Sequence, residues 1–279
     1  RAAERRAQVY GTLGGYGLPS EPDHTAGTAL IRQATTAAIS YSNAEDRQEV
    51  RDRLVAILAT GLRDAMPGSD HQVAYANGLA TAATTDAADL LKGWLSGEEV
   101  PEGLSIDQGM RWRLVTALAR VGRVGEDEIA AELQRDNTIS GSEQAAGARA
   151  AMPTAQAKQA AWQRATTDES VPNETYRQLV MQFIQPDQTE VLSPYVDPYL
   201  ELCKAIDSHE GQWAKAGHAQ VQNALMWLFP STEVIDAAWL NKLEGWVSDN
   251  DPGSTVRRVL AERADNARRI LRCQEASRG

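Results

Sequence analysis

The sequence is poor in the residues and patterns that several classes of protein require. It has two cysteines, Cys203 and Cys273, without CxxC spacing, which indicates neither a disulfide framework nor a cysteine metal site. Its longest apolar runs are only a few residues, as at 224–229, and are too short to cross a bilayer. Alternating β-branched residues bounded by turn signals are also missing, which argues against a β-sheet. The sequence therefore predicts a helical protein that does not span a membrane.

Positive charge is also in short supply. The chain has 28 lysines and arginines against 38 acidic residues, a formal net charge of -10 at pH 7. Duplex nucleic acid and anionic membranes are therefore not expected partners. The stretch Arg1 to Gln8 is not followed by an apolar region, so no signal peptide is predicted. We expect a soluble, cytoplasmic protein.

Histidine is scarce, and its spacing does not favour catalysis. The four histidines are scattered, and only His209 is followed by a glutamate. A zinc peptidase helix needs a second imidazole four residues later, where this chain has Trp213, and Gly211 weakens a helix at this point. A Gly-x-Ser-x-Gly nucleophile elbow is also missing. We therefore predict no catalytic residue and no metal ligand in this chain, and a solvated loop around 209–210.

Amphipathic helical patterns, by contrast, recur along the chain. The clearest has apolar residues at i, i+3, i+4, i+7 and i+8, namely Tyr176, Leu179, Val180, Phe183 and Ile184. Similar faces occur at 50–65, 221–229 and 256–271. Short loops between such helices favour packing of chain neighbours. The predicted fold is all-α, a superhelical stack of antiparallel helix pairs of the HEAT or armadillo type (an α-solenoid), in a single domain over residues 1–279.

Local signals place several helix ends and loops. Ser69-x-x-Gln72 and Ser140-x-x-Glu143 have capping-box spacing, and Asp107 is predicted to be an N-cap. Asp136-x-Thr138-x-x-Gly141 is typical of a turn between two helices that is capped by side chains, which is a structural role. The segments 14–27 and 96–105 are rich in glycine, proline, serine and glutamate and predict long loops.

The stretch from Asp107 to Trp162 carries the most distinctive residues. Between these two it contains Arg111-Trp112-Arg113-Leu114, Gly122, Glu132, Asp136-Asn137-Thr138-Ile139-Ser140-Gly141, Ala150-Ala151-Met152-Pro153 and Lys158. This pattern resembles the C-terminal helical (ERAP1-like) domain of M1-family zinc aminopeptidases, the aminopeptidase N group. The resemblance continues more loosely through 176–183, 190–202 and 227–230, and it fades before about Asp86.

The resemblance implies a noncatalytic role for this chain. In that family zinc lies in an upstream catalytic domain, held by a His-Glu-x-x-His helix and a later glutamate, and a Gly-x-Met-Glu-Asn segment binds the amino terminus of the substrate. Neither motif occurs here. The implied function is to cover the active-site cleft and control peptide access to it. The implied partners are the upstream catalytic domain and the peptide substrates of the parent enzyme, a hydrolase that removes N-terminal residues.

Two arginines are candidates for a substrate channel. Arg111 and Arg113 flank Trp112 within the resembling stretch, and they either face the cavity or are ordinary surface charges. No cofactor is expected in this chain, since the zinc of the parent enzyme belongs to its catalytic domain, and the chain alone should be inactive. A different class of function stays open, a helical-repeat scaffold that binds a protein partner on its concave face. The pattern from Asp107 to Trp162 favours the peptidase interpretation.

Overall fold

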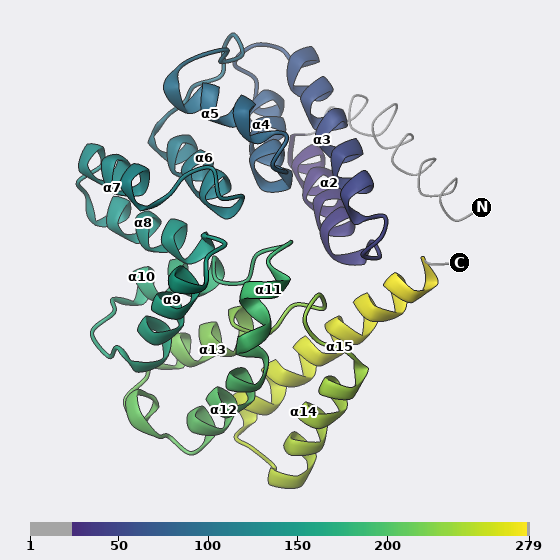
Figure 1. Cartoon of the computed structure of the whole chain (residues 1–279), viewed down its shortest axis with the longest axis vertical. Helices are drawn as coiled ribbons and strands as arrows, with labels where there is room; N and C mark the ends of the chain where they lie inside the picture. The colour runs from purple at the N-terminus through teal and green to yellow at the C-terminus, as the bar shows by residue number, and fades with distance from the viewer. Residues whose placement is uncertain (1–23, 278–279) are drawn as a thin grey trace. The chain divides into compact units, whose positions relative to one another are not determined.

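The computed structural model describes residues 24–277, and its elements are labelled in Figure 1. Most of this range is helical, and no residue in it belongs to a β-strand. The prediction of an all-α fold is confirmed. The chain divides into two compact units, unit 1 with residues 1–123 and 272–279 and unit 2 with residues 124–271. The superhelical stack and the single domain over 1–279 stay predictions. Within 24–277, no helix has both the length and the apolar character that a bilayer span needs.

Unit 1 is built from helices that pack on α4. Its elements are α2 (His24–Thr36), the π-helical turn η2 (Ala37–Tyr41), α3 (Arg47–Asp64), α4 (Asp70–Ala82), α5 (Ala88–Ser96) and α6 (Gln108–Arg120). Helices α2, α3 and α6 all contact α4, and α5 packs on α6. The approach of α2 to α4 is close, because a Cβ atom on Gly78 would lie 2.6 Å from Cγ2 of Ile31. Only glycine allows the two helices to meet at this position.

Unit 2 repeats this pairing of neighbouring helices. It contains α7 (Glu126–Arg135), α8 (Ile139–Ala151), α9 (Ala155–Thr167), α10 (Asn173–Met181), α11 (Thr189–Leu192), the 3₁₀ turn η3 (Ser193–Tyr195), α12 (Val196–Asp207), η4 (Gly211–Ala214), α13 (His218–Trp227), α14 (Ala237–Asn250) and most of α15 (Ser254–Ala276). Helix α8 packs on α7, α9 and α10, and α10 packs on α13. The buried face of α8 consists almost wholly of alanine and glycine, which lets α10 approach closely.

The last residues of α15 belong to unit 1. The side-chain amide of Gln274 donates to the backbone carbonyl of Ser40 at 2.8 Å, and Nδ2 of Asn43 donates to the carbonyl of Ser277 at 3.2 Å. These bonds join the end of the chain to the segment that follows α2. Each of these two bonds in unit 1 therefore joins residues that are 234 positions apart in sequence.

The amphipathic faces predicted from sequence are the buried faces of the helices. Tyr176, Leu179, Val180 and Phe183 are at most 2% exposed, and Ile184 is half-buried; α10 ends at Met181, before the last two of these five. In the face predicted at 50–65, positions 50, 54 and 58 are buried and positions 57, 61 and 65 are half-buried. Buried apolar positions also occur on α13 and α15. Each fully buried leucine or phenylalanine stabilises the fold by about 1.5–3 kcal/mol. Some successive helices contact one another as predicted, among them α3 with α4, α5 with α6, α7 with α8 and α8 with α9, whereas α2 with α4 and α8 with α10 are contacts across an intervening helix.

Most of the predicted helix ends are confirmed, and two predictions were wrong. Oγ of Ser69 accepts from the amide of Gln72, and Oδ1 of Asp107 accepts from the third residue of α6. Ser140 is not a cap, because α8 begins at 139 and Thr138 accepts the amide proton of Gly141 instead. The loop at 96–105 lies between α5 and α6. Of the loop predicted at 14–27, residues 24–27 form the start of α2, and residues 14–23 lie outside the described range.

Candidate functional site

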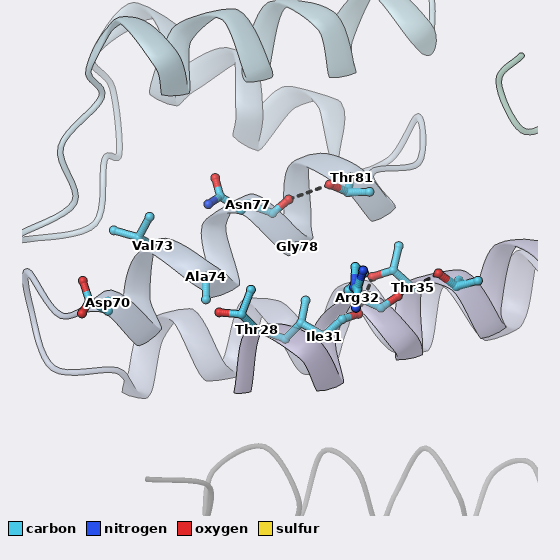
Figure 2. Close-up of a pocket in the computed structure, with 11 residues that line it drawn as sticks. Thr28, Ile31, Arg32, Thr35, Asp70, Val73, Ala74, Asn77, Gly78 and Thr81 are labelled. Carbon is cyan, nitrogen blue, oxygen red and sulfur yellow. Dashed lines mark hydrogen bonds between the residues drawn. The ribbon is translucent and has the colours of Figure 1, made fainter. Parts of the chain in front are cut away.

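A groove between α2 and α4 in unit 1 offers both charged groups and room for a ligand. It has a volume of about 370 Å³ and is shown in Figure 2. Its apolar floor consists of Ile31, Val73, Ala74 and Gly78. Its polar lining comes from both helices and consists of Thr28, Arg32, Thr35, Thr36, Asp70, Asn77 and Thr81. The volume lies at the lower end of the range for pockets that bind small ligands.

The hydroxyl protons of three groove threonines are already used within their own helices. Thr35 donates to the carbonyl of residue 31 at 2.8 Å, Thr36 to that of residue 32 at 2.9 Å, and Thr81 to that of residue 77 at 2.9 Å. Their oxygen atoms can still accept a hydrogen bond. The groups that are left to bind a charged or amide-containing ligand are the hydroxyl of Thr28 and the side chains of Arg32, Asp70 and Asn77.

The two predicted channel arginines lie on α6 and point to different helices. Nη1 of Arg113 donates to Oδ1 of Asn77, so this side chain contacts the lining of the α2–α4 groove. Nη1 of Arg111 donates at 2.8 Å to the backbone carbonyl of Leu95 at the end of α5. Trp112 between them is only 2% exposed. The sequence pattern thus contains one residue that reaches the groove; that either arginine lines a substrate channel stays a prediction.

A buried lysine connects three helices of unit 2. Lys158 on α9 is 0% exposed, and its Nζ donates at 2.7 Å to each of two backbone carbonyls, those of Ala150 and Phe183. Ala150 lies in the last turn of α8, and Phe183 lies just beyond the end of α10. The Nζ atom is also 5.4 Å from the centre of the Phe183 ring. These carbonyls carry the partial negative charge of helix C-termini, which favours a cation here.

Burial changes the charge state of this lysine. Desolvation lowers the pKa of Lys158 from 10.5 to about 7, since moving a charged ammonium group out of water is costly. Within residues 24–277 no carboxylate forms an ion pair with it. A lysine near neutral pKa is a frequent signal of catalysis. Here the ammonium nitrogen donates to two backbone carbonyls at helix ends, so its role is that of a helix cap.

Unit 1 contains a comparable arrangement built from arginine. Nη2 of Arg51 and Nη2 of Arg120 both donate to the carbonyl of Ala83, at 3.0 and 2.8 Å. Ala83 follows the end of α4, so two buried guanidinium groups meet at one helix C-terminus. Desolvation, together with the charge of Arg51, lowers the pKa of Arg120 to about 10. Both arginines act as structural links between α3, α4 and α6.

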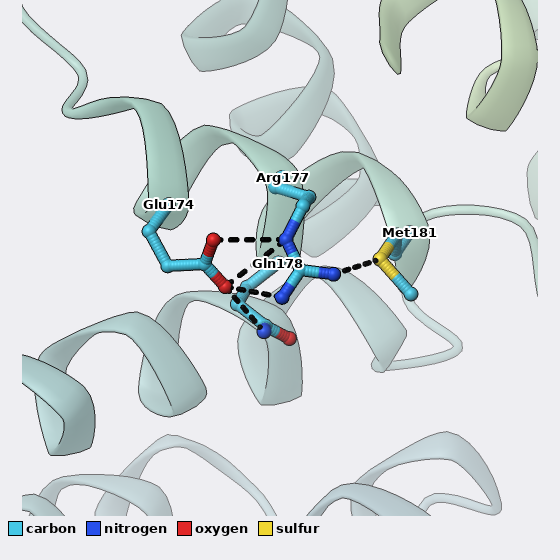
Figure 3. A network of polar contacts seen from close by, with 4 residues as sticks. All are labelled: Glu174, Arg177, Gln178 and Met181. Carbon is cyan, nitrogen blue, oxygen red and sulfur yellow. Dashed lines mark hydrogen bonds and ion pairs between the residues drawn. The ribbon is translucent and has the colours of Figure 1, made fainter. Parts of the chain in front are cut away.

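An ion-pair network on the surface of α10 joins four side chains of that helix to one another (Figure 3). The carboxylate of Glu174 accepts from Nε and Nη2 of Arg177 and from Nε2 of Gln178, and Nη1 of Arg177 contacts the sulfur of Met181. Hydrogen bonding from Arg177 lowers the pKa of Glu174. The four residues lie within two turns of one helix, and the network is a stabilising feature of that helix.

The His209-Glu210 pair lies in a surface loop, as predicted. Residues 208–210 are exposed between α12 and the turn η4, and His209 adopts a positive φ of 57°. Its Nδ1 atom lies 3.0 Å from the carbonyl oxygen of Asp207. Over the range that the structure describes, no three histidine, cysteine or acidic side chains are grouped in a way that could hold a metal ion. Cys203 is buried, Cys273 is exposed, and both are free thiols.

Comparison with known proteins identifies the family. Residues 1–269 match the family model described as ERAP1-like C-terminal domain. The chain belongs to the ERAP1-like C-terminal domain family. It is also 35% identical over 277 residues to aminopeptidase N of Streptomyces lividans, an alignment that covers 99% of this chain and 32% of that protein. The chain therefore spans about a third of the length of this relative, and it is a C-terminal domain of an aminopeptidase N-like protein.

Several positions that carried the family resemblance have structural roles in this ERAP1-like domain. Asp107 caps α6, and Lys158 caps α8 and α10. Thr138 and Gly141 form the turn before α8, where Oγ1 of Thr138 donates to Oδ1 of Asp136 at 2.7 Å. A Cβ atom on Gly141 would lie 2.1 Å from the carbonyl oxygen of Asp136. In this chain, several of the residues that carry the resemblance fix helix ends.

The sequence reasoning missed the groove and the buried cations. The groove needs α2 beside α4, which no local pattern gives. The cations could have been found, because each lies on a face that is otherwise apolar. Lys158 is three and seven residues before Ala161 and Ala165, and Arg51 is three residues before Leu54, all of them buried. A basic residue at core spacing is a usable signal for a cation that caps a neighbouring helix.

Proposed function

We propose that this chain is the noncatalytic C-terminal domain of a zinc metallo-aminopeptidase, where it covers the active-site cleft and controls which peptides reach it. The single observation that carries the proposal is the family match over residues 1–269, together with 35% identity to aminopeptidase N. The chain itself has no His-Glu-x-x-His and no Gly-x-Met-Glu-Asn segment. The chemistry, the removal of an N-terminal residue by zinc-activated water, then belongs to the remaining two thirds or so of the parent protein.

The proposal includes the surroundings in which the domain works. Its partners are its own upstream catalytic domain and the peptide substrates of the parent, in the cytoplasm. The helix pairs stack into one HEAT-like superhelix over residues 1–279, which acts as a cover that excludes folded proteins. Contacts between neighbouring helices, as in α7 with α8 and α8 with α9, support such a stack. An acidic chain with a net charge of -10 suits a partner that is neither nucleic acid nor an anionic membrane.

The proposal is tested on the parent enzyme with and without this domain. Both forms are assayed for zinc content, for hydrolysis of an aminoacyl anilide, and for removal of the N-terminal residue from a folded protein. We expect both forms to hold stoichiometric zinc and to cleave the anilide. Only the truncated form should act on the folded protein at a rate comparable to its rate on the anilide. The isolated chain should bind no zinc and cleave neither substrate.

Two results would contradict the proposal. One is an unchanged preference for small substrates after removal of the domain, provided that the truncated enzyme still cleaves the anilide. The other is stoichiometric zinc and turnover in the isolated chain. If the truncated enzyme does not fold, the same size selectivity can be measured on the intact parent with a disulfide that locks the domain to the catalytic part. Locking should then slow long peptides more than the anilide.

A further inference from the structure

Two unpaired charges of opposite sign line the α2–α4 groove. Arg32 comes from α2 and Asp70 is the first residue of α4, and both are exposed. Neither side chain forms a hydrogen bond or an ion pair with another residue of the chain as the structure describes it, unlike Arg113 nearby, which is bound to Asn77. A ligand with one positive and one negative end would complement both.

The spacing of these charges sets the length of such a ligand. A Cβ atom on Gly27 would lie 3.6 Å from the His71 ring, and one on Gly78 would touch Ile31. Both contacts advance along the chain together, so α2 and α4 run in the same direction. Arg32, the residue after Ile31, therefore lies near the level of Gly78. Gly78 is eight residues beyond Asp70, which places the two levels about 12 Å apart along the axis of the helix. Figure 2 shows Asp70 and Arg32 at separate positions along the groove.

We propose that the α2–α4 groove binds a short zwitterionic peptide, with the peptide ammonium on Asp70 and its carboxylate on Arg32. An extended chain advances about 3.3–3.6 Å per residue, so three residues span about 10 Å, and the flexible arginine side chain covers the remaining distance. The apolar floor around Val73 and Ala74 accommodates small side chains. The carboxylate of Asp70 and the guanidinium of Arg32 can each form a charge-assisted hydrogen bond with the peptide, the stronger kind in proteins.

Asn77 supplies the contact for the middle of the peptide. Its Oδ1 atom already accepts from Arg113, which fixes the side chain and leaves Nδ2 as a donor in the groove. A backbone carbonyl of the ligand is the natural acceptor. Arg113, one of the two arginines singled out in the sequence, is then a positioning residue for this site. The proposal concerns binding by this chain alone, so it goes beyond the proposed function and does not depend on it.

The test is an NMR titration of the 279-residue chain with trialanine. Methyl groups of Ile31 and Val73 lie in the groove and report binding, while those of Ile129 and Ile206 in unit 2 serve as internal references. Two further ligands each lack one charge: N-acetyl-trialanine and trialanine amide. We expect trialanine to shift the groove methyls with a dissociation constant on the order of 1 mM, and each blocked peptide to bind about fivefold more weakly or worse.

Two variants identify which residue binds which end. Arg32→Gln should weaken trialanine about fivefold and leave the amide unaffected, because the amide has no carboxylate to lose. Asp70→Asn should likewise weaken trialanine, which has a free ammonium group. The same variant should leave the affinity for N-acetyl-trialanine unchanged, because that peptide has no ammonium group to lose. Arg63→Gln and Asp52→Asn on α3 change the net charge equally at exposed positions outside the groove, and they serve as matched controls.

Three outcomes would overturn the proposal. The first is the absence of shifts at the Ile31 and Val73 methyl groups at a trialanine concentration about 20 times the expected dissociation constant of about 1 mM. The second is equal affinity for the free and the blocked peptides. The third is an equal effect of the groove variants and their controls, which would indicate general electrostatic attraction. Because binding is measured on this chain alone, a negative result leaves the proposed peptidase role untouched, and failure of that role does not affect this measurement.

Discussion

The buried lysine of unit 2 gives the sharpest prediction about stability. Lys158 has a folded-state pKa of about 7, against an ordinary value of 10.5. Between these two pH values the unfolded state binds more protons than the folded state, so the free energy of unfolding rises with pH. Each pKa unit corresponds to about 1.4 kcal/mol. From pH 6 to pH 9 this lysine alone should add about 3 kcal/mol to stability, and the gain is lost again as the pH falls through 7.

The substitution Lys158→Met tests this reasoning. Methionine keeps the length of the side chain but leaves the carbonyls of Ala150 and Phe183 without their donor, at a cost of about 1–3 kcal/mol each. At pH 6 that loss is largely offset, because the cost of burying a charge is removed as well. At pH 9 the wild-type lysine is neutral, and the full loss remains. The variant should therefore be close to wild type at pH 6 and several kcal/mol less stable at pH 9.

The measurement is urea unfolding of both proteins at pH 6 and pH 9, with Lys92→Met as control. Lys92 is exposed on α5, so its replacement removes the same charge without removing a buried donor. We expect the difference in unfolding free energy between wild type and Lys158→Met to grow by about 3 kcal/mol over this range. A difference that is the same at both pH values would refute the assignment of a neutral lysine at this site. Unit 2 fluorescence should be followed, since two units need not unfold together.

Three further predictions concern single positions. Gly141→Ala should destabilise the chain by about 1–3 kcal/mol in urea unfolding, because the new Cβ atom would lie 2.1 Å from a backbone carbonyl oxygen. The control Gly109→Ala, whose new Cβ atom would have its nearest neighbour at 3.5 Å, should be neutral or stabilising in the same assay. Asp107→Ala should cost about 1 kcal/mol by the same assay, through loss of the N-cap of α6, and an unchanged midpoint would contradict that role. In the native chain at pH 8 a thiol reagent should label Cys273 and not Cys203, since burial raises the pKa of Cys203 to about 12; labelling of both before unfolding would show that this thiol is accessible.

The helices could be predicted from sequence because their signals are local. The face with Tyr176 and Leu179 repeats every 3.6 residues, and such a stripe must be buried wherever the helix packs. Asp107 and Ser69 cap helices through bonds to amides three residues ahead, which also depend only on nearby sequence. The capping error at Ser140 has a local cause as well. Thr138 and Ser140 compete for the same helix start, and the contact of Gly141 with the preceding turn decides in favour of Thr138.

The candidate site could not be predicted in the same way. Arg32 and Asp70 are ordinary surface charges in the sequence. They line one groove only because α2 lies beside α4, although α3 separates the two helices in sequence. Arg113 was singled out from the sequence, but its contact with Asn77 depends on how α6 packs on α4. These relations join residues that are about 40 positions apart, and no helical period carries information over such distances.

The sequence by itself determined the helical class of this chain, its family, and the ends of many of its helices, since each rests on periodicity or on bonds that reach only three or four residues. Only the tertiary structure decided that Lys158 and Arg51 are buried cations at the ends of other helices, and that a charged groove lies between α2 and α4. The physical reason is the cost of desolvation. Whether a charge is solvated or buried depends on which helix ends lie next to it, and chain packing fixes those neighbours.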